Sequence, residues 1–399
     1  MAYKKSIRKS KIGIIISVIA IIILLAAYLL YYFNIPPFDF YIGDGSGKKG
    51  VVYTDGDLRI HFLDIGQGDS VLIELPDGKN MLIDAGKDNK ETENKIIKYL
   101  EDKNISSVDY GLLTHSDADH CGGYDAVINS PNITFKTMYM PLLNASRSSD
   151  ANQAVIKDRF DALAGNTDKA TLLPSDSSFQ RGNIQDITTA VYQKFVDATV
   201  SEGCTIVFSY QGQVIEGEGY SITFLNPSYS LYRKVSSAAD KNNVSPIVIL
   251  EFNSQKFMLT GDADNAAEQN SIAFAATNNI NMDVDIIKIA HHGGKESSSK
   301  EFLDKAKPEC AAICVGKNSY GHPTSEVLSR LKAIKCTVFT TQDKGTMVLT
   351  ANGDKYSWKF EKSSGDFGSA DEYDEETTAH VNTFKCIPTY SFNVVLRAA

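Results

Sequence analysis

The stretch Leu112-Leu-Thr-His-Ser-Asp-Ala-Asp-His-Cys-Gly-Gly123 places four potential metal ligands within six residues. An apolar, strand-like run precedes these ligands, and a glycine pair follows them. Side chains two apart on an extended chain share one side, so His115, Asp117 and Asp119 can converge, and His120 joins them once the chain turns. Imidazole and carboxylate ligands without thiolates suit Zn²⁺ or Mn²⁺. The alternative is a solvated loop, but the spacing favours a metal site.

Composition sets wide limits on the class of protein. The 399 residues allow one large domain or two ordinary ones, and the 43% hydrophobic content is ample for a packed core. The formal net charge of −9 argues against a protein that coats nucleic acid through a general positive field. An enzyme that holds one phosphate with a few local groups remains open.

The N-terminal region predicts a membrane anchor. Residues 12–33 form an almost unbroken apolar run, which is about 33 Å long as a helix and enough to cross a bilayer. Lysines and an arginine lie before it, so positive-inside logic leaves residues 1–11 in the cytoplasm and everything after Asn34 outside. A cleaved signal peptide is the alternative, but the run is longer than a typical signal core and no small-x-small cleavage site follows Phe33. We therefore predict a single-pass cell-membrane protein with an extracytoplasmic domain.

The remaining chain divides by composition. Residues 34–54 are rich in proline and glycine and read as a stalk. Residues 55–362 are predicted to form one domain, within which the polar stretch 142–200 is an insertion or lid. Residues 363–399 form an acidic linker and tail. Strands are expected in two runs, each mixed with helices, which fits a layered α/β sandwich. The expected strands are 58–64, 70–75, 80–84, 108–114, 135–141, 204–210, 213–216, 220–226, 246–252, 256–260, 284–290, 310–315, 336–341 and 345–349, and the main helices are 91–101, 124–129, 265–277 and 325–334.

The candidate ligands all follow predicted strands. His115, Asp117, Asp119 and His120 follow one strand, and Asp262 and His291 follow two later strands. Strand ends on one rim of a sheet can gather ligands from distant parts of the sequence into one pocket. A buried carboxylate such as Asp262 needs a cation or hydrogen bonds to offset its desolvation. One ion needs only three or four ligands, so the six groups named above predict two divalent ions, Zn²⁺ or Mn²⁺.

The run from His115 to Gly123 resembles the signature of the metallo-β-lactamase superfamily, with Asp117 in place of its second histidine. Four further motifs make the chain similar to the hydrolase domain of ComEC-type competence proteins: Leu63-Asp-Ile-Gly-Gln-Gly-Asp-Ser70, Leu259-Thr-Gly-Asp262, Lys288-Ile-Ala-His-His-Gly293 and Tyr320-Gly-His-Pro323. The resemblance covers about residues 58–360. It implies a metallo-β-lactamase-like αββα four-layer sandwich, preceded here by one transmembrane helix.

The resemblance also implies roles for individual residues. His115 and Asp117 would hold one ion, which we call the first metal position. The second metal position would comprise Asp119, His120 and His291, with Asp262 bridging the two ions. Asp84 would orient the ligand loop through hydrogen bonds. Asn242 stands where many relatives have a third histidine, and it is expected to be a weak ligand or a substrate contact.

The other candidates have weaker signals. His292 is expected to support a ligand or to contact substrate. Lys288 is expected to meet a phosphate, with an edge-strand lysine as an equal alternative, and His322 to act as a general acid or phosphate contact. The predicted catalytic set is therefore Asp119, Asp262, His322 and Lys288. His61 is assigned to structure, and Gln67 and Asp69 to a turn near the pocket.

The function implied by the resemblance is hydrolysis of phosphodiesters, most directly of nucleic acid, because the ComEC-type domain is associated with degrading one strand of incoming DNA. Such proteins carry many membrane spans and this chain is predicted to have one, so a separate multi-span channel protein would be its partner. Three alternatives stay open: a hydrolase of another envelope substrate (a phosphodiester, lactone or β-lactam), a non-catalytic binding module, and an accessory subunit of a separate DNA channel.

Overall fold

The structure is a computed structural model that describes residues 56–143, 189–232, 234–235, 239–353 and 355–362, together with the backbone of 386–388. All of them belong to one compact unit, Tyr53–Ala399. None of the helices within this described part is both long and apolar enough to cross a bilayer. The predicted anchor at 12–33, the stalk, most of the 142–200 insertion and nearly all of the tail lie outside the described residues.

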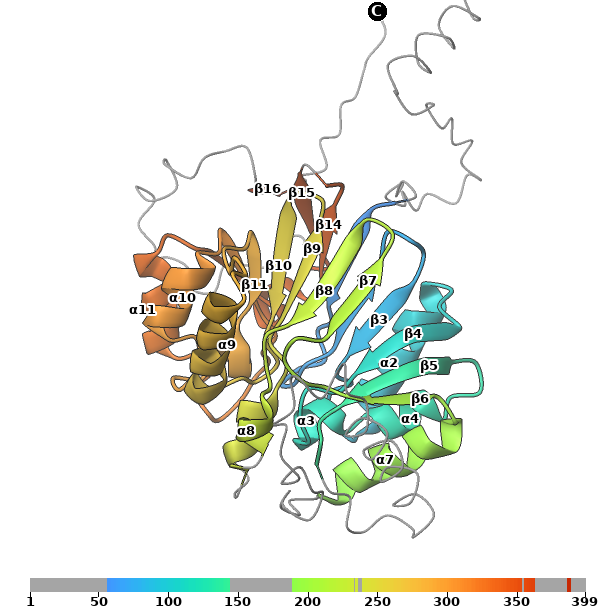
Figure 1. Cartoon of the computed structure of the whole chain (residues 1–399). Coiled ribbons are helices and arrows are strands. Elements are labelled where there is room, and N and C mark those ends of the chain that lie inside the picture. Colours follow the sequence, from blue (N-terminus) through green and yellow to red (C-terminus); the bar gives the residue numbers. More distant parts are fainter. Residues whose placement is uncertain are drawn as a thin grey trace, which may run out of the picture. The chain divides into compact units, whose positions relative to one another are not determined.

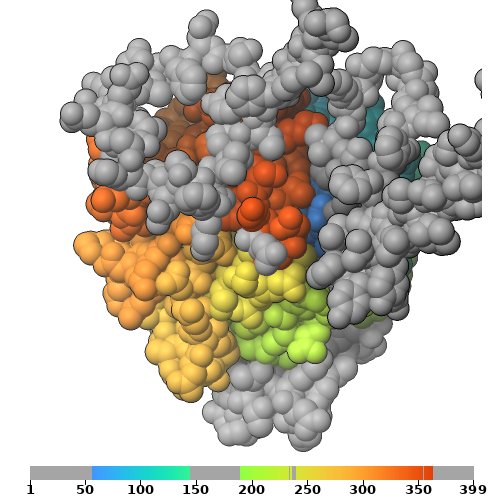
Figure 2. All heavy atoms as spheres, turned by 90° about the horizontal axis from the view of Figure 1, so that it is seen from above, coloured from blue at the N-terminus to red at the C-terminus, as the bar shows by residue number. Residues whose placement is uncertain are grey.

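Nine strands form the first sheet, and the two ends of the domain meet in it. β1 pairs antiparallel with both β2 and β14, so the first described strand lies against residues near position 350. Figure 2 shows this proximity from above, with blue atoms beside red ones. The order is β16 (Cys386–Pro388), β15 (Tyr356–Phe360), β14 (Met347–Ala351), β1 (Leu58–Phe62), β2 (Val71–Glu74), β3 (Asn80–Ile83), β4 (Ser107–Leu112), β5 (Thr134–Met140) and β6 (Thr205–Phe208).

Seven strands form the second sheet. Its half that carries the later motifs is parallel, since β10, β11, β12 and β13 all run the same way. The order is β13 (Thr337–Thr340), β12 (Cys310–Ile313), β11 (Ile286–Lys288), β10 (Gln255–Leu259), β9 (Val248–Phe252), β8 (Tyr220–Phe224) and β7 (Val214–Gly217).

Helices cover the outer face of each sheet (Figure 1). α2 (Lys90–Asp102), α4 (Tyr124–Ile128) and α7 (Ala190–Glu202) pack on the first sheet, and α9 (Asn265–Thr277), α10 (Lys300–Ala306) and α11 (Ser325–Ala333) on the second. Short helical turns complete the described elements: α3 (Ala118–Cys121), α8 (Tyr229–Tyr232), η2 (Ala239–Val244), η3 (Ala290–Gly293) and α12 (Thr341–Lys344).

Alternation along the strands explains the layers. In β2, Leu72 packs toward the helices with Ile96 of α2, whereas Val71 and Ile73 pack between the sheets. In β10 of the second sheet, Phe257 likewise points inward, whereas Met258 points outward into the core that includes α10 and α11. Both faces of each sheet are thus covered. The predicted αββα four-layer sandwich is confirmed.

The differences from the predicted elements are local. β15, α7 and α10 were not predicted, and α7 is a core helix at the end of the stretch 142–200 that was predicted to be an insertion or lid. The predicted strand 284–290 shortens to β11, because the chain leaves the extended conformation and turns into η3. The strands that position the site agree with the prediction. β3 and β4 are parallel neighbours, and so are β10 and β11. The chain segments after these four strands therefore meet at one rim of the sandwich.

Candidate metal centre

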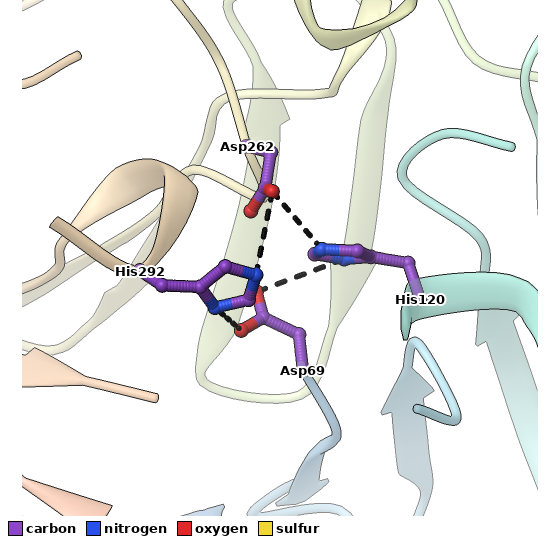
Figure 3. A group of neighbouring side chains, drawn as sticks. All are labelled: Asp69, His120, Asp262 and His292. Carbon is purple, nitrogen blue, oxygen red and sulfur yellow. Dashed lines mark ion pairs between the residues drawn. The ribbon is translucent and has the colours of Figure 1, made fainter. Parts of the chain in front are cut away.

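Four buried side chains from four chain segments meet at this rim (Figure 3). Asp69 follows the turn after β1, His120 lies on α3, Asp262 follows β10 and His292 lies in η3. Their polar atoms lie within 4.8 Å of one another. His120 Nε2 is 3.1 Å from Asp262 Oδ2, and His292 Nε2 is 3.5 Å from the same oxygen. Such a group of donors in so small a volume can hold a metal ion.

Three imidazoles are oriented in the same way. His120 Nδ1 donates to Asp84 Oδ2 at 2.7 Å, and His292 Nδ1 donates to the Cys314 carbonyl at 2.7 Å. His115 Nδ1 lies 3.1 Å from the Thr114 hydroxyl, whose own proton goes to Asp84. Each Nδ1 is therefore committed to the protein, which leaves each Nε2 as a lone-pair donor. Within the described part of the chain, none of the three Nε2 atoms has a hydrogen-bond partner although all are buried.

Asp84 connects the ligand loop to β3. One carboxylate oxygen accepts from the Thr114 amide at 2.8 Å, and the other accepts from the Thr114 hydroxyl at 2.7 Å as well as from His120. Asp84 is fully buried and adopts a left-handed backbone with φ of 57°. That conformation is costly for a residue with a side chain and concentrates at functional sites. The structure places Asp84 where the sequence analysis expected it, behind the candidate ligands.

Asp69 belongs to the buried group but faces the other side of the imidazoles. Its oxygens lie 3.3 Å from His292 Nδ1 and 3.9 Å from His120 Nδ1. Asp119 and Asp262, by contrast, both lie 3.5 Å from His292 Nε2. An ion held by the Nε2 atoms would therefore contact Asp119 and Asp262, while Asp69 supports the imidazoles from behind. We call Asp119, His120, Asp262 and His292 the central cluster.

Lys288 is placed differently from the phosphate contact that the sequence analysis expected. It is buried, and its ammonium donates to the Gly261 carbonyl at 3.0 Å and to the Ile289 carbonyl at 3.3 Å. The same ammonium forms an ion pair with Asp69. All three of its donors are thus used inside the protein, so Lys288 fixes Asp69 and the loop after β10.

His291 and His292 have exchanged the places expected of them. Both adopt left-handed backbones, with φ of 51° and 52°, and this sends adjacent side chains in directions that strand alternation does not predict. His292 enters the buried cluster, whereas His291 is half-buried with Nδ1 3.1 Å from Asp264 Oδ1 and 3.3 Å from the Asn242 amide nitrogen. The ligand roles themselves stay predictions, but the geometry favours His292.

The first metal position contains a lysine that the sequence analysis did not single out. Lys241, in η2, is buried and forms an ion pair with Asp117 Oδ1. The other oxygen of Asp117 lies 3.7 Å from His115 Nε2. Burial alone would raise the pKa of Asp117, but His115 and Lys241 outweigh it and lower the pKa to about 2.

His322 and Tyr320 form the rim on the remaining side. The His322 ring lies 5.4 Å from that of His291 and 6.4 Å from that of His292, between centroids. Asn318 fixes the loop, since its carbonyl oxygen accepts from the amides of Tyr320 and His322. Tyr320 is 72% exposed, and its ring lies 5.8 Å from the His322 ring.

The carboxylates around the central cluster favour a positive charge on its histidines. Burial disfavours the charged imidazole of His292, yet the carboxylates of Asp262 and Asp69 outweigh burial and raise its pKa to about 10. For His120, burial is likewise outweighed by Asp262 and Asp84, and the pKa lies well above its ordinary value. Without a metal, these carboxylates would hold protons on the histidines. The residues present therefore fit a divalent cation, which would replace those protons.

Glycines bring three loops into direct backbone contact around the centre. A β-carbon on Gly68, whose φ is 145°, would lie 2.6 Å from the Asp119 carbonyl. The Asp69 amide donates to that carbonyl at 3.1 Å. A β-carbon on Gly316 would overlap the backbone of Gly66. The loop after β1 is thus packed between the ligand loop and the loop after β12.

Asp69, Lys241 and Asp264 were the functional candidates that sequence reasoning missed or assigned elsewhere. Asp69 lies in a motif quoted for the resemblance, and Lys241 precedes Asn242, so position in a motif was the available signal for both. No comparable signal pointed to Asp264.

Residues 63–135 match the family model described as the metallo-beta-lactamase superfamily. The protein has the metallo-beta-lactamase fold. The chain is 24% identical over 340 residues to ComE operon protein 3 of Bacillus subtilis (strain 168), an alignment that covers 81% of this chain and 36% of that protein. Recombination protein 2 of Haemophilus influenzae is 25% identical over 292 residues, covering 72% of this chain and 28% of that protein.

Competence protein ComA of Neisseria gonorrhoeae is 23% identical over 294 residues, covering 73% of this chain and 32% of that protein. The chain thus spans about a third of the length of these relatives. Among solved structures, the metallo-beta-lactamase fold protein YhfI from Bacillus subtilis is similar at 11% identity and a TM-score of 0.41, covering 74% of this chain and 100% of that one. The predicted resemblance to competence proteins is confirmed: the chain has the metallo-beta-lactamase fold and is related to them.

Proposed function

We propose that the chain is a metal-dependent phosphodiesterase that cleaves nucleic acid. The observation that carries this proposal is the convergence of the His120 and His292 Nε2 atoms with the carboxylates of Asp119 and Asp262 at one rim of the sandwich. A divalent ion bound there would activate water and stabilise the charge that develops on a phosphoryl group. The central cluster would hold the ion, and Asp84 and Asp69 would keep the two imidazoles in place.

The sequence predicts two divalent ions, Zn²⁺ or Mn²⁺. The two predicted ion positions have different surroundings. The central cluster brings together two imidazoles and two carboxylates, a donor set that suits either ion. At the first metal position, His115 and Asp117 stand beside the Lys241 ammonium. We propose the central cluster as the principal ion site, with Zn²⁺ and Mn²⁺ as the two ions to test.

His322 supports the proposal as a group that can act on a substrate. It is half-buried beside the two histidines of η3, and burial together with His291 and His292 lowers its pKa, so it is neutral near pH 7. Its Nδ1 is buried and lacks a hydrogen-bond partner among the described residues. A neutral imidazole at the rim can donate a hydrogen bond to a phosphate oxygen or accept a proton as a general base, whereas the general-acid role would need its protonated form.

The substrate class comes from the relatives and from Tyr320. The relatives are named as ComE operon, recombination and competence proteins, and we carry over from them a DNA substrate. Tyr320 presents an exposed aromatic face next to His322. Aromatic side chains beside a nucleic-acid path stack bases without sequence preference. This local platform does not require the general positive charge that the chain lacks.

The location and partners are proposed from sequence. The apolar run 12–33 with its preceding lysines supports a single-pass anchor that leaves the hydrolase domain outside the cytoplasm. A nuclease held there would act on DNA at the cell surface, and a separate multi-span channel protein would complete uptake. Co-purification of the full chain from membranes with a multi-span protein would test this partner.

The test of the function uses the purified full chain, stripped of metal and then supplied with Zn²⁺ or Mn²⁺ separately. Labelled single- and double-stranded DNA, a lactone and a β-lactam serve as substrates. We expect cleavage of DNA that depends on the added ion and stops with a chelator. Hydrolysis of the lactone or β-lactam alone would favour another envelope hydrolase. Ion binding without hydrolysis of any phosphodiester would contradict the proposal.

A further inference from the structure

Lys241 stands at the position where the family resemblance implies a metal ion. Its side chain is 4% exposed, and its ammonium contacts Asp117 Oδ1 directly. The remaining oxygen of Asp117 faces His115 Nε2 at 3.7 Å. A fixed positive charge therefore already lies on the carboxylate that was expected to bind the first ion.

The other ligands of the first metal position are incomplete. Asn242 was expected to be a weak ligand there, but its amide nitrogen lies 3.3 Å from both Asp264 Oδ2 and His291 Nδ1. Its carbonyl oxygen is buried and has no hydrogen-bond partner within the described residues. His115 and Asp117 alone offer fewer protein ligands than a divalent ion takes in a typical site.

A count of charges leads to the same conclusion. Five carboxylates surround the ligand loop and the central cluster. Asp69 pairs with the buried Lys288 and Asp117 with the buried Lys241. Asp84 accepts hydrogen bonds from His120 and Thr114. The two that remain, Asp119 and Asp262, both face His292 Nε2 at 3.5 Å. One divalent ion at the central cluster neutralises these two. A second ion bound to Asp117 would share its carboxylate with an ammonium, and the two like charges would repel each other at close range.

We infer that Lys241 takes the place of the first metal ion: the chain binds one divalent ion, at the central cluster, and the Lys241 ammonium supplies the second positive charge. The inference rests on the proposed function only in requiring that the central cluster binds metal. Lys241 would then be a fixed cation beside the ion, in the place where a two-metal hydrolase has its second ion.

The decisive measurement is the number of ions per chain, by elemental analysis and native mass spectrometry, at saturating Zn²⁺ and at saturating Mn²⁺. We expect one ion in the wild type, one in Asp117→Asn, and none in Asp262→Asn. Two ions in the wild type, falling to one in Asp117→Asn, would overturn the inference and leave the proposed function intact. No ion at all would overturn both.

Lys241→Met removes the charge and keeps the length of the side chain. We expect it to bind a second ion, because Asp117 and His115 are then free to act as ligands. Lys136→Met is the matched control, since it removes a lysine that pairs with Asp109 away from the centre and leaves Asp117 paired, so it should still bind one ion. A folded Lys241→Met chain that binds one ion would show that Lys241 does not exclude the second. If the variant fails to fold, as judged by thermal melting, the wild-type count decides.

Discussion

Two buried histidine clusters in the same domain have opposite electrostatics. In the first sheet, His61 Nδ1 lies 2.8 Å from the Tyr99 hydroxyl and Nε2 lies 2.8 Å from Glu74. Glu74 also pairs with Arg59 and approaches Lys103 at 3.7 Å, so cations outnumber this carboxylate. Burial, aided by these cations, lowers the pKa of His61.

In the central cluster the balance is reversed. Carboxylates exceed the lysines, and the pKa values of His120 and His292 are raised although both rings are as buried as His61. The comparison teaches that burial does not distinguish a structural histidine from a ligand. The distinguishing property is whether the surrounding charges are already neutralised by the protein. The His61 cluster is closed in this sense, and the central cluster requires an added cation.

The largest expected effect is that of Asp262→Asn, which removes one negative charge from the central cluster and none from the His61 cluster. We expect loss of the bound ion and a fall in DNA cleavage of about 10³-fold, because the ion and its electrostatic stabilisation are both lost. Metal content and initial rates measure this. Glu74→Gln, which alters the His61 cluster, is the control and should keep both. Equal losses in the two variants would refute the distinction between the clusters.

Asp84→Asn should have the next largest effect. It keeps the shape but removes the carboxylate that holds His120 and Thr114, so we expect metal affinity to fall by about 10- to 100-fold. A competition titration with a metal indicator measures this fall. Asp109→Asn is the control, because Asp109 accepts from Asn80 and Lys136 away from the centre. An unchanged affinity in Asp84→Asn would show that His120 does not need this support.

Tyr320→Ala tests the rim without touching either cluster. Loss of base stacking should raise the KM for single-stranded DNA by roughly 5- to 100-fold and leave the KM for an abasic strand of equal length unchanged. Tyr320→Phe retains the aromatic face and should behave as the wild type. A rise of equal size on both strands would contradict a stacking role.

The smallest expected effect is the pH dependence that Glu74, in the His61 cluster, gives to the free energy of unfolding. Burial alone would raise the pKa of Glu74, but His61, Lys103 and Arg59 lower it from 4.5 to about 2. Its contribution to the free energy of unfolding is therefore present above pH 4.5 and is lost as the pH falls toward 2. Allowing for solvent screening, we expect about 1 to 2 kcal/mol, which Glu74→Gln should lack. Urea unfolding at pH 6 and pH 3 measures this, and a variant with the full wild-type loss would contradict it.

The sequence predicted the layers and the rim better than the contacts within the site. Alternating apolar strands and the spacing of His115 to His120 were sufficient for the sandwich and for the ligand loop. The choice between His291 and His292 was not predictable by alternation, because both residues adopt left-handed backbones in η3, after β11 has ended. The pairings of Lys288 with Asp69 and of Lys241 with Asp117 join segments far apart in sequence, and only the packed sheets define them.

The glycine contacts between the loops carry a consequence for engineering and for natural variation. Because Gly316 abuts Gly66, and Gly68 abuts the Asp119 carbonyl, a single added methyl group can displace a candidate ligand through the main chain alone. Mutational tolerance should therefore follow backbone contact rather than distance from the ion. A search for altered metal preference would do well to sample Gly68 and Gly316 before the ligands themselves.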